Sequence, residues 1–378
     1  MKLLHTSDWH LGRMAGETPL YEDQVFFIDA ICNIAKEYSV DAVIIAGDIF
    51  DRSAPSAEAV SLYNMAMTKL CVELGIRVIA VAGNHDSAER VENCNRLLER
   101  AGLYVLGSIN AEPIVVNLGD TDIFLMPWVK ESRVKCLYPA EADNIGSLED
   151  AYRVLNKKML EKATPGRKRI LVTHSFMTGA TTSESDRTAV LGTADQVGAG
   201  VFSDFDYVAL GHIHKPQDIG GNARYSGTPM PYSFGAEEKQ EKSVTIIDTD
   251  TMERTIVPVP LLHKRVTIEG TLDEILNGQY DADTLNAYTK VVVNDAYVGL
   301  DAMTRLEAKF NNLLEVTGLT YDDKDSKITL TMDELRELES DPVAIFKSFF
   351  RDIINSEPDE DELELFEKCV REYEEVEK

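Results

Sequence analysis

The segment Lys2-Leu3-Leu4-His5-Thr6-Ser7-Asp8-Trp9-His10 opens the chain with a pattern on which the fold depends. Lys2–Thr6 predicts a short β-strand, and Asp8 and His10 follow where that strand ends. Similar polar ends are Gly47-Asp48 after Ala42–Ala46, Gly83-Asn84-His85-Asp86 after Arg77–Val81, His174 after Arg169–Thr173, and Gly211-His212-Ile213-His214 after Tyr207–Leu210. Because ligands bind at the carboxyl ends of strands in open α/β sheets, these side chains are expected to converge.

The first 260 residues alternate such strands with amphipathic helices, which predicts an α/β layered domain. Apolar residues recur at helical spacing in three segments, Phe27–Tyr38, Val60–Leu74 and Leu148–Met159. Further strands are expected at Val105–Leu106, Ile114–Asn117, Ile123–Met126, Ser243–Asp248 and Arg254–Val259.

The pattern changes after Pro258-Val259-Pro260 to that of a small α+β unit. Its expected elements are strands at Arg265–Ile268, Thr289–Val293 and Leu314–Thr317 and helices at Thr271–Leu276 and Ala302–Asn312. Asp341-Pro342 then resembles a helix start, with a helix through Ile354, and a second helix is expected over Glu362–Glu377. We therefore expect three parts, at residues 1–262, 263–340 and 341–378.

The side chains at the strand ends suit two adjacent divalent cations. Carboxylate, imidazole and amide groups form a mixed donor set that favours Mn²⁺, Fe²⁺ or Zn²⁺ over Ca²⁺. One carboxylate must bridge two metals about 3.5 to 4 Å apart to clamp a phosphoryl group, and Asp48 in its tight turn is the expected bridge. The expected ligands are Asp8, His10, Asp48 and His214 for one metal, and Asp48, Asn84, His174 and His212 for the other.

His85 follows the ligand Asn84 and is not itself expected to bind metal. Its position suits a group that orients the phosphate or protonates the leaving oxygen. Asp51 is its expected carboxylate partner, and Asp86 is the alternative. Each motif alone is more often structural, and only the occurrence of all five in order favours a catalytic centre.

Taken together, these motifs resemble the calcineurin-like metallophosphoesterases. Gly47–Arg52 matches the Gly-Asp-x-x-Asp-Arg turn of that superfamily, in which the second Asp, here Asp51, supports the catalytic histidine. Leu4–Gly12, Leu210–Pro216 and Tyr225–Pro229 resemble one branch more closely, the DNA double-strand-break repair nucleases of the SbcD type.

The resemblance implies a two-layered β-sandwich core flanked by helices, a small α+β capping domain that helps hold DNA, and C-terminal helices that clasp a coiled coil. It implies a Mn²⁺-dependent 3′-to-5′ exonuclease and single-strand endonuclease that trims blocked or hairpin DNA ends. The implied assembly is a homodimer bound to an SbcC-type ABC ATPase with a coiled coil. Ser56–Leu74 and Ala88–Arg100 are the candidate dimer helices, although both could simply face the core.

The net charge of −27 excludes a histone-like nucleic-acid binder. Residues 1–264 carry a net charge of −10 and residues 265–378 carry −17, so the acidity is concentrated in the C-terminal third. Arg13, Arg90 and Arg187 are candidate phosphate contacts near the motifs. The polar stretch around Arg187, residues 178–200, is either a DNA-contacting loop or a disordered surface loop.

No apolar run approaches the about 20 residues that a membrane-spanning helix needs. The N-terminus turns polar at Thr6 before a signal-peptide core could form, and the five cysteines are scattered without a Cys-x-x-Cys pair. These features favour a cytoplasmic protein. Two other functions stay open: a phosphatase or cyclic-nucleotide phosphodiesterase on the same scaffold, and a catalytically silent scaffold for the ATPase.

Overall fold

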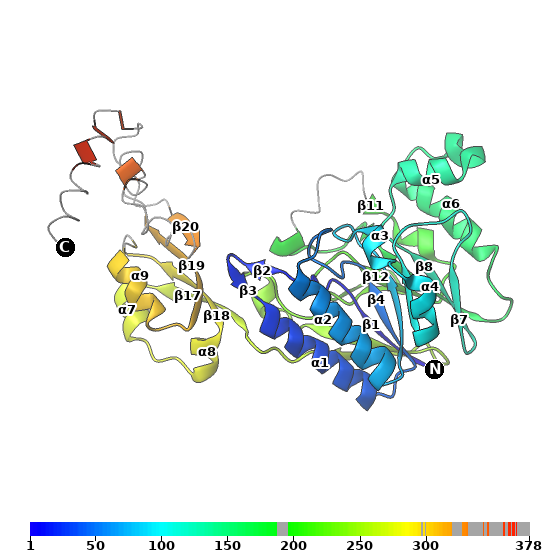
Figure 1. The fold of residues 1–378 in the computed structure, drawn as a ribbon, viewed down its shortest axis with the longest axis horizontal. Coiled ribbons are helices and arrows are strands. Elements are labelled where there is room, and N and C mark those ends of the chain that lie inside the picture. The colour runs from blue at the N-terminus through cyan, green and yellow to red at the C-terminus, as the bar shows by residue number, and fades with distance from the viewer. Residues whose placement is uncertain are drawn as a thin grey trace. The chain divides into compact units, whose positions relative to one another are not determined.

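The computed structural model describes residues 1–186, 196–295, 298, 300–319 and 327–331, with scattered residues between 343 and 368. The chain forms two compact units. The first contains Met1–Arg13 and Pro19–Leu262, and the second contains Met14–Thr18 and His263–Lys378. Figure 1 traces the elements of both units along the chain.

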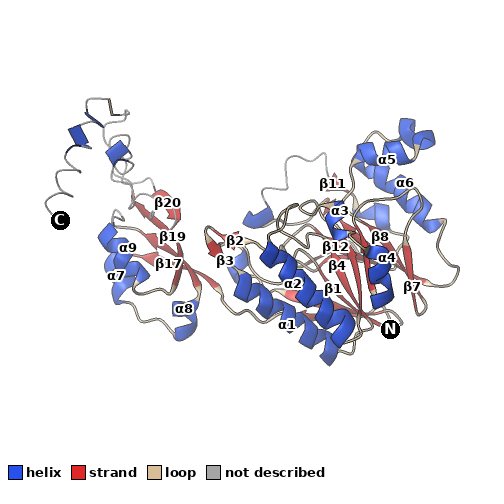
Figure 2. Ribbon diagram, viewed as in Figure 1, coloured by secondary structure: helices blue, strands red, loops and turns tan. Residues whose placement is uncertain are grey.

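Two six-stranded sheets form the first unit (Figure 2). The strands of the first sheet are, in order, β16 (Arg254–Pro258), β15 (Ser243–Asp248), β1 (Lys2–Thr6), β4 (Ala42–Ala46), β5 (Arg77–Val81) and β6 (Leu103–Leu106). The strands of the second are β13 (Gln217–Ile219), β14 (Ala223–Tyr225), β12 (Tyr207–Gly211), β9 (Lys168–His174), β8 (Thr121–Met126) and β7 (Val115–Leu118). Neighbours from β1 to β6 and from β14 to β8 are parallel.

The two sheets pack face to face, which confirms the expected two-layered sandwich. Ile44 and Ile79 of the first sheet share one buried cluster with Ile123, Leu125 and Val172 of the second. Strand side chains alternate between faces, so Phe124, between Ile123 and Leu125, belongs to a second cluster on the outer face. Strands with both faces covered are apolar at nearly every position, as these are.

Helices cover the outer faces of the sandwich. In the second sheet's outer cluster, Tyr152 and Leu155 of α6 (Leu148–Leu160) pack with Phe124. Helices α1 (Tyr21–Glu37) and α2 (Ala57–Met67) lie side by side on the first sheet's side (Figure 1). Both α2 and α6 begin where a serine side chain, Ser56 or Ser147, accepts a hydrogen bond from a first-turn backbone N–H.

The remaining elements of the first unit are short. They are a π-helix at Thr68–Glu73, α3 (Ala88–Val91), α4 (Asn95–Leu98), α5 (Glu131–Leu137), β10 (Phe176–Met177), β11 (Gln196–Val197), and 3-10 turns at Glu99–Ala101, Pro139–Asn144, Glu184–Asp186, Ala199–Phe202 and Glu237–Lys239. The two-residue strand β2 (Met14–Ala15) belongs to the second unit, and β3 (Thr18–Pro19) has one residue in each unit. The expected continuous helix over Ala88–Arg100 is wrong. Cys94 has a φ of +60°, in the left-handed region, and this ends one helical segment before the next begins.

The second unit is a four-stranded sheet with helices. Its sheet order is β17 (Arg265–Gly270), β18 (Tyr288–Val293), β19 (Asn312–Leu319) and β20 (Lys327–Thr331), and only the last pair is antiparallel. Its helices are α7 (Leu272–Asn277), α8 (Ala282–Asn286) and α9 (Leu300–Glu307). Ile275, Val291 and Leu306 meet in its buried core. The expected C-terminal helices lie almost entirely outside the described residues, which contain no helix long and apolar enough to cross a membrane.

The two sheets of the sandwich approach closely at Gly211. A Cβ atom built there would lie 1.8 Å from the carbonyl oxygen of Ala46 and 2.8 Å from Nδ1 of His174. Ala46 ends β4 in one sheet, while Gly211 and His174 end β12 and β9 in the other. Glycine therefore lets the ends of three strands meet.

We expect Gly211→Ala to lower the free energy of unfolding of the first unit by about 1–3 kcal/mol, because the backbone must move to admit the methyl group. Thermal unfolding of the full chain measures the loss. Gly200→Ala is the matched control, since a Cβ at Gly200 has no heavy atom within 4 Å and should change stability by about 0.5 kcal/mol at most. Equal melting temperatures for the two variants would contradict the close approach.

Candidate metal centre

The five predicted polar strand ends meet at one edge of the sandwich. Asp8 and His10 follow β1, Asp48 follows β4, and Asn84 and His85 follow β5. His174 ends β9, and His212 and His214 follow β12 of the second sheet. The backbone is strained here: Asp8, His10, Asp48 and His212 have φ values of +53°, +44°, +47° and +108°. They are four of the seven described non-glycine residues with positive φ, and such strain is typical of functional sites.

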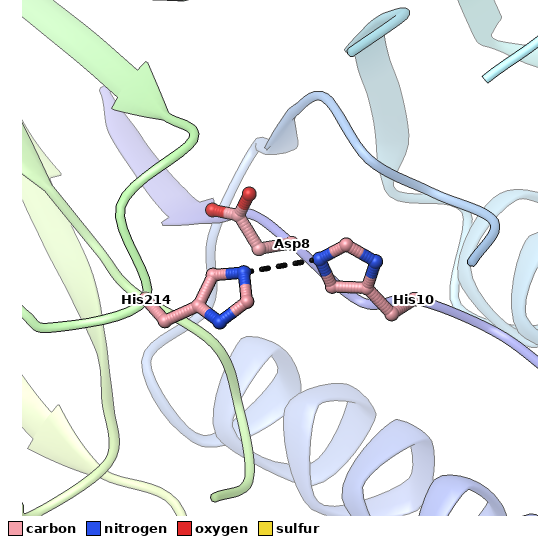
Figure 3. Close-up of side chains that lie close together, drawn as sticks. All are labelled: Asp8, His10 and His214. Carbon is pink, nitrogen blue, oxygen red and sulfur yellow. Dashed lines mark hydrogen bonds between the residues drawn. The ribbon is translucent and has the colours of Figure 1, made fainter. Parts of the chain in front are cut away.

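Asp8, His10 and His214 form the first group of possible ligands (Figure 3). Each offers a nitrogen or oxygen atom, and these atoms lie within 4.8 Å of one another. The Nε2 atoms of His10 and His214 are 3.2 Å apart, and all three residues are buried. Gln24 fixes the turn, since its side-chain amide donates to the carbonyl oxygen of His10 and accepts from the backbone N–H of Gly12.

Asp48, Asn84, His174 and His212 form the second group. Oδ1 of Asn84 is 3.0 Å from Nε2 of His174 and 3.0 Å from Nδ1 of His212. Those two ring nitrogens are 3.3 Å apart, and Oδ2 of Asp48 is 3.3 Å from the same Nε2. The structure thus brings together the four side chains that the sequence assigned to one metal.

Asp48 lies between the two groups. Its Oδ2 is 3.3 Å from Nε2 of His174 in the second group and 3.9 Å from Nε2 of His10 in the first. Its Oδ1 accepts the backbone N–H of His85 at 2.9 Å, which holds the carboxylate in place. This is the position that a bridging carboxylate requires.

The ligand atoms of the first group are better arranged to bind a divalent cation than to hydrogen-bond to one another. Nε2 of His10 and Nε2 of His214 lie only 3.2 Å apart beside the buried carboxylate of Asp8, so three possible donor atoms lie within 4.8 Å of one another. Among the described residues, Nδ1 of His10 is also one of the buried polar atoms without a hydrogen-bond partner. The mixed oxygen and nitrogen set suits Mn²⁺, Fe²⁺ or Zn²⁺.

Surrounding groups orient the ligands. Nδ1 of His174 is 2.9 Å from the carbonyl oxygen of Ala46, so it carries the proton there and Nε2 is directed into the centre. The indole ring of Trp128 stacks on the ring of His212, with centroids 5.2 Å apart and an interplanar angle of 26°. Trp128 was not predicted from the sequence, because nothing in its local pattern distinguishes it from a core aromatic residue.

An electrostatic interaction between His174 of the second sheet and Asp48 of the first shifts the pKa values of both groups. Burial alone would lower the pKa of His174, but the carboxylate of Asp48 outweighs it and raises the pKa to about 9. Burial would raise the pKa of Asp48, yet the His174 imidazolium holds it well below its usual range. Burial raises the pKa of Asp8 to about 6 and lowers that of His212 to about 3. In the metal-free protein, the His174 imidazolium is therefore the counter-ion of Asp48.

His85 lies beside both groups, but its contact with Asp51 differs from the expectation. Nδ1 of His85 is 2.9 Å from the backbone carbonyl oxygen of Asp51, not from its carboxylate. That carboxylate instead lies 3.5 Å from Nδ1 of His10 and 3.5 Å from the guanidinium of Arg13. The alternative partner, Asp86, accepts backbone N–H groups of Gly83, Ile49 and Phe50 and so shapes the loop.

The three candidate arginines have different surroundings. Arg13 lies at the centre, paired with Asp51 and placed 4.8 Å from the ring centroid of Tyr232. Arg90 is exposed on α3. Arg187 lies outside the described residues. The structure therefore places only Arg13 among the metal-site residues.

We expect divalent-metal affinity to rise with pH between about 6.5 and 8.5. A cation must displace the proton from Nε2 of His174, whose pKa is about 9, so affinity should increase about tenfold per pH unit and level off above that pKa. Calorimetric titration of Mn²⁺ in buffers of different ionisation enthalpy counts the protons released. A pH-independent affinity without proton release would contradict the pairing of His174 with Asp48.

Comparison with known proteins places this centre in a family. The calcineurin-like phosphoesterase model matches residues 1–216. The SbcD C-terminal model, described as a type 5 capsule protein repressor C-terminal domain, matches residues 260–353. The chain is 30% identical over 328 residues to the SbcD subunit of the SbcCD nuclease of Staphylococcus saprophyticus, covering 85% of this chain and 86% of that protein.

Among solved structures, the protein TT1561 of Thermus thermophilus matches with a TM-score of 0.38 and 12% identity, over 68% of this chain and 99% of that one. The family assignment depends instead on the two family matches and the Staphylococcus relative. The chain, with its two groups of candidate metal ligands at the strand ends of a β-sandwich, belongs to the calcineurin-like phosphoesterases and, within them, to the SbcD branch.

Proposed function

We propose that this chain is the nuclease component of an SbcCD-type complex that processes DNA ends in repair and recombination. Its proposed activity is Mn²⁺-dependent, with 3′-to-5′ exonuclease and single-strand or hairpin endonuclease action. The observation that carries the proposal is the convergence of seven ligand side chains in two adjacent groups, with Asp48 between them and His85 beside them. The Staphylococcus saprophyticus relative is named as part of a nuclease.

The side chains have distinct roles in this proposal. Two divalent cations held by Asp8, His10, Asp48 and His214 and by Asp48, Asn84, His174 and His212 would supply Lewis-acid polarisation of the phosphoryl group and an activated water. His85 donates Nδ1–H to the carbonyl oxygen of Asp51, and as an imidazolium it would give the second ring proton, on Nε2, to the leaving oxygen. Arg13 provides positive charge for the phosphate at the edge of the centre.

The acidity of the chain limits how it binds DNA. A net charge of −27 repels a polyanion, and 17 of these negative charges belong to residues 265–378. Two divalent cations reverse the sign of the local charge where a phosphodiester must lie. Strong DNA binding in this account therefore needs both the metals and a partner that adds positive surface.

That partner is an SbcC-type ABC ATPase with a coiled coil, bound by residues 341–378 of this chain. Residues 1–262 are the nuclease domain, and residues 263–340 are a capping domain that helps hold DNA. Two copies of the chain form a homodimer in a cytoplasmic heterotetramer. The SbcD C-terminal match over residues 260–353 supports the similarity of this region to such proteins.

Incubation of the full-length chain with Mn²⁺ and four substrates tests the proposal: blunt duplex DNA, hairpin DNA, a phosphopeptide and a cyclic nucleotide. The expected result is cleavage of the two DNAs, with no comparable turnover of the others. His85→Ala should lower the cleavage rate about 10²- to 10⁴-fold, because general acid catalysis contributes that much.

Metal content is the control, since His85→Ala should retain the same number of Mn²⁺ ions as the wild type. Turnover of the phosphopeptide or cyclic nucleotide without DNA cleavage would contradict the nuclease proposal and identify a phosphatase or a cyclic-nucleotide phosphodiesterase. If the metal-loaded chain turned over none of the four substrates, even with the ATPase added, the chain would be a catalytically silent scaffold.

A further inference from the structure

Every polar atom of His214 except Nε2 is held by a neighbouring group. Its backbone N–H donates to Oδ1 of Asp186 at 3.0 Å. Its carbonyl oxygen accepts from Nζ of Lys242 at 3.1 Å and from the backbone N–H of Thr228 at 3.1 Å. Nδ1 lies 2.5 Å from Oγ of Ser185, while Nε2 is directed at His10. The residue is thus fixed at three points, with its fourth polar atom in the metal centre.

The proton on His214 can be placed from these contacts. The hydroxyl of Ser185 donates its hydrogen to Oε1 of Glu237, so its oxygen can only accept from the imidazole. Nδ1 therefore carries the proton, and Nε2 presents its lone pair. Oδ1 of Asp186 at 3.4 Å and Oε1 of Glu237 at 3.6 Å both lie near Nδ1 and favour the same tautomer.

Glu237 is itself held rigidly. Its Oε1 accepts from Ser183 and Ser185, and its Oε2 accepts from the backbone N–H groups of Tyr232 and Ser233 at 2.6 and 3.2 Å. The ammonium of Lys242 lies 3.7 Å from Oε2, and both side chains have an exposed fraction of zero. A buried ion pair with this many hydrogen bonds has little freedom to rotate.

The two metal groups differ in how their histidines are oriented. In the second group, Nδ1 of His174 is oriented by the backbone carbonyl oxygen of Ala46. In the first group, His214 is oriented through a side-chain hydroxyl and a buried carboxylate. A substitution in the Ser185–Glu237 contact to His214 should therefore change the affinity for the metal of the first group and leave the affinity for the other metal unchanged.

We propose that Ser185 and Glu237 are positioning residues that hold His214 in its Nε2-ligating tautomer and thereby set the affinity of the first metal alone. The inference rests on the two-metal centre of the proposed function, but not on the nature of the substrate. Partners of this kind typically change metal affinity by about 10- to 100-fold. Glu237 and Ser185 lie outside every motif that the sequence analysis used for ligands.

Titration of the full-length chain with Mn²⁺, followed by the electron paramagnetic resonance signal of the free ion, tests the proposal. The wild type should bind two ions, and His10→Ala identifies the binding step that belongs to the first group. Ser185→Ala should weaken that step about 10- to 100-fold and change the other by less than about threefold. Ser185 is preferred to Glu237 for substitution, because removal of Glu237 leaves the buried Lys242 unpaired and threatens the fold.

Ser183→Ala is the matched control. The Ser183 hydroxyl lies 2.9 Å from a carboxylate oxygen of Glu237 and 2.9 Å from one of Asp186, whereas it is Ser185 that contacts the His214 ring, so both steps should stay within about threefold of the wild type. Ser185→Thr, which keeps the hydroxyl, should restore the first step. Unchanged binding in Ser185→Ala, equal weakening of both steps, or the same loss in Ser183→Ala would overturn the inference. A wild-type chain that binds fewer than two ions would instead overturn the proposed function.

Discussion

The ends of β4, β9 and β12 meet at a close approach of the two sheets of the sandwich, and the candidate metal centre depends on that meeting. His174 of one sheet reaches the carbonyl oxygen of Ala46 and the carboxylate of Asp48 of the other. Glycine at position 211 makes this approach sterically possible. Since each sheet supplies part of each ligand group, neither sheet alone forms a metal site. The large core between the sheets therefore stabilises the fold and also sets the ligand distances.

The charges of the buried candidate ligands determine how much they destabilise the fold and which groups they can bind. Two buried aspartates and four buried histidines in contact are unfavourable unless protons or cations balance them. In the metal-free chain, the proton on His174 fulfils this role for Asp48. Divalent cations would replace it and reverse the sign of the local charge at this edge of the sandwich. The same cations would make phosphate binding compatible with a net charge of −27.

Much of the fold could be predicted from the sequence, because the strands that form the sandwich are short apolar runs with polar ends. β1, β4, β5 and β15 begin and end at the predicted residues. The short strands β10, β11, β13 and β14 were missed, since two or three residues carry no periodic signal. The break at Cys94 was missed because a left-handed residue other than glycine has no clear signature in composition.

The seven candidate ligand side chains follow strands in recognisable motifs, and the structure brings them together as the sequence predicts. The contacts that orient these side chains could not be predicted from the sequence. The partner of His85 is a backbone carbonyl oxygen, which no residue identity encodes. Trp128 comes from a loop, and Ser185 and Glu237 come from short 3-10 turns, whose tertiary positions the chain pattern does not reveal.

The central claim is that Asp48 holds two cations side by side between the sheets. The electron paramagnetic resonance spectrum of the chain loaded with two Mn²⁺ equivalents tests it most directly, because ions about 3.5 to 4 Å apart with a shared carboxylate are exchange-coupled. The account predicts a coupled multiline spectrum that Asp48→Asn abolishes. A spectrum of isolated Mn²⁺ ions in the fully loaded wild-type chain would contradict it.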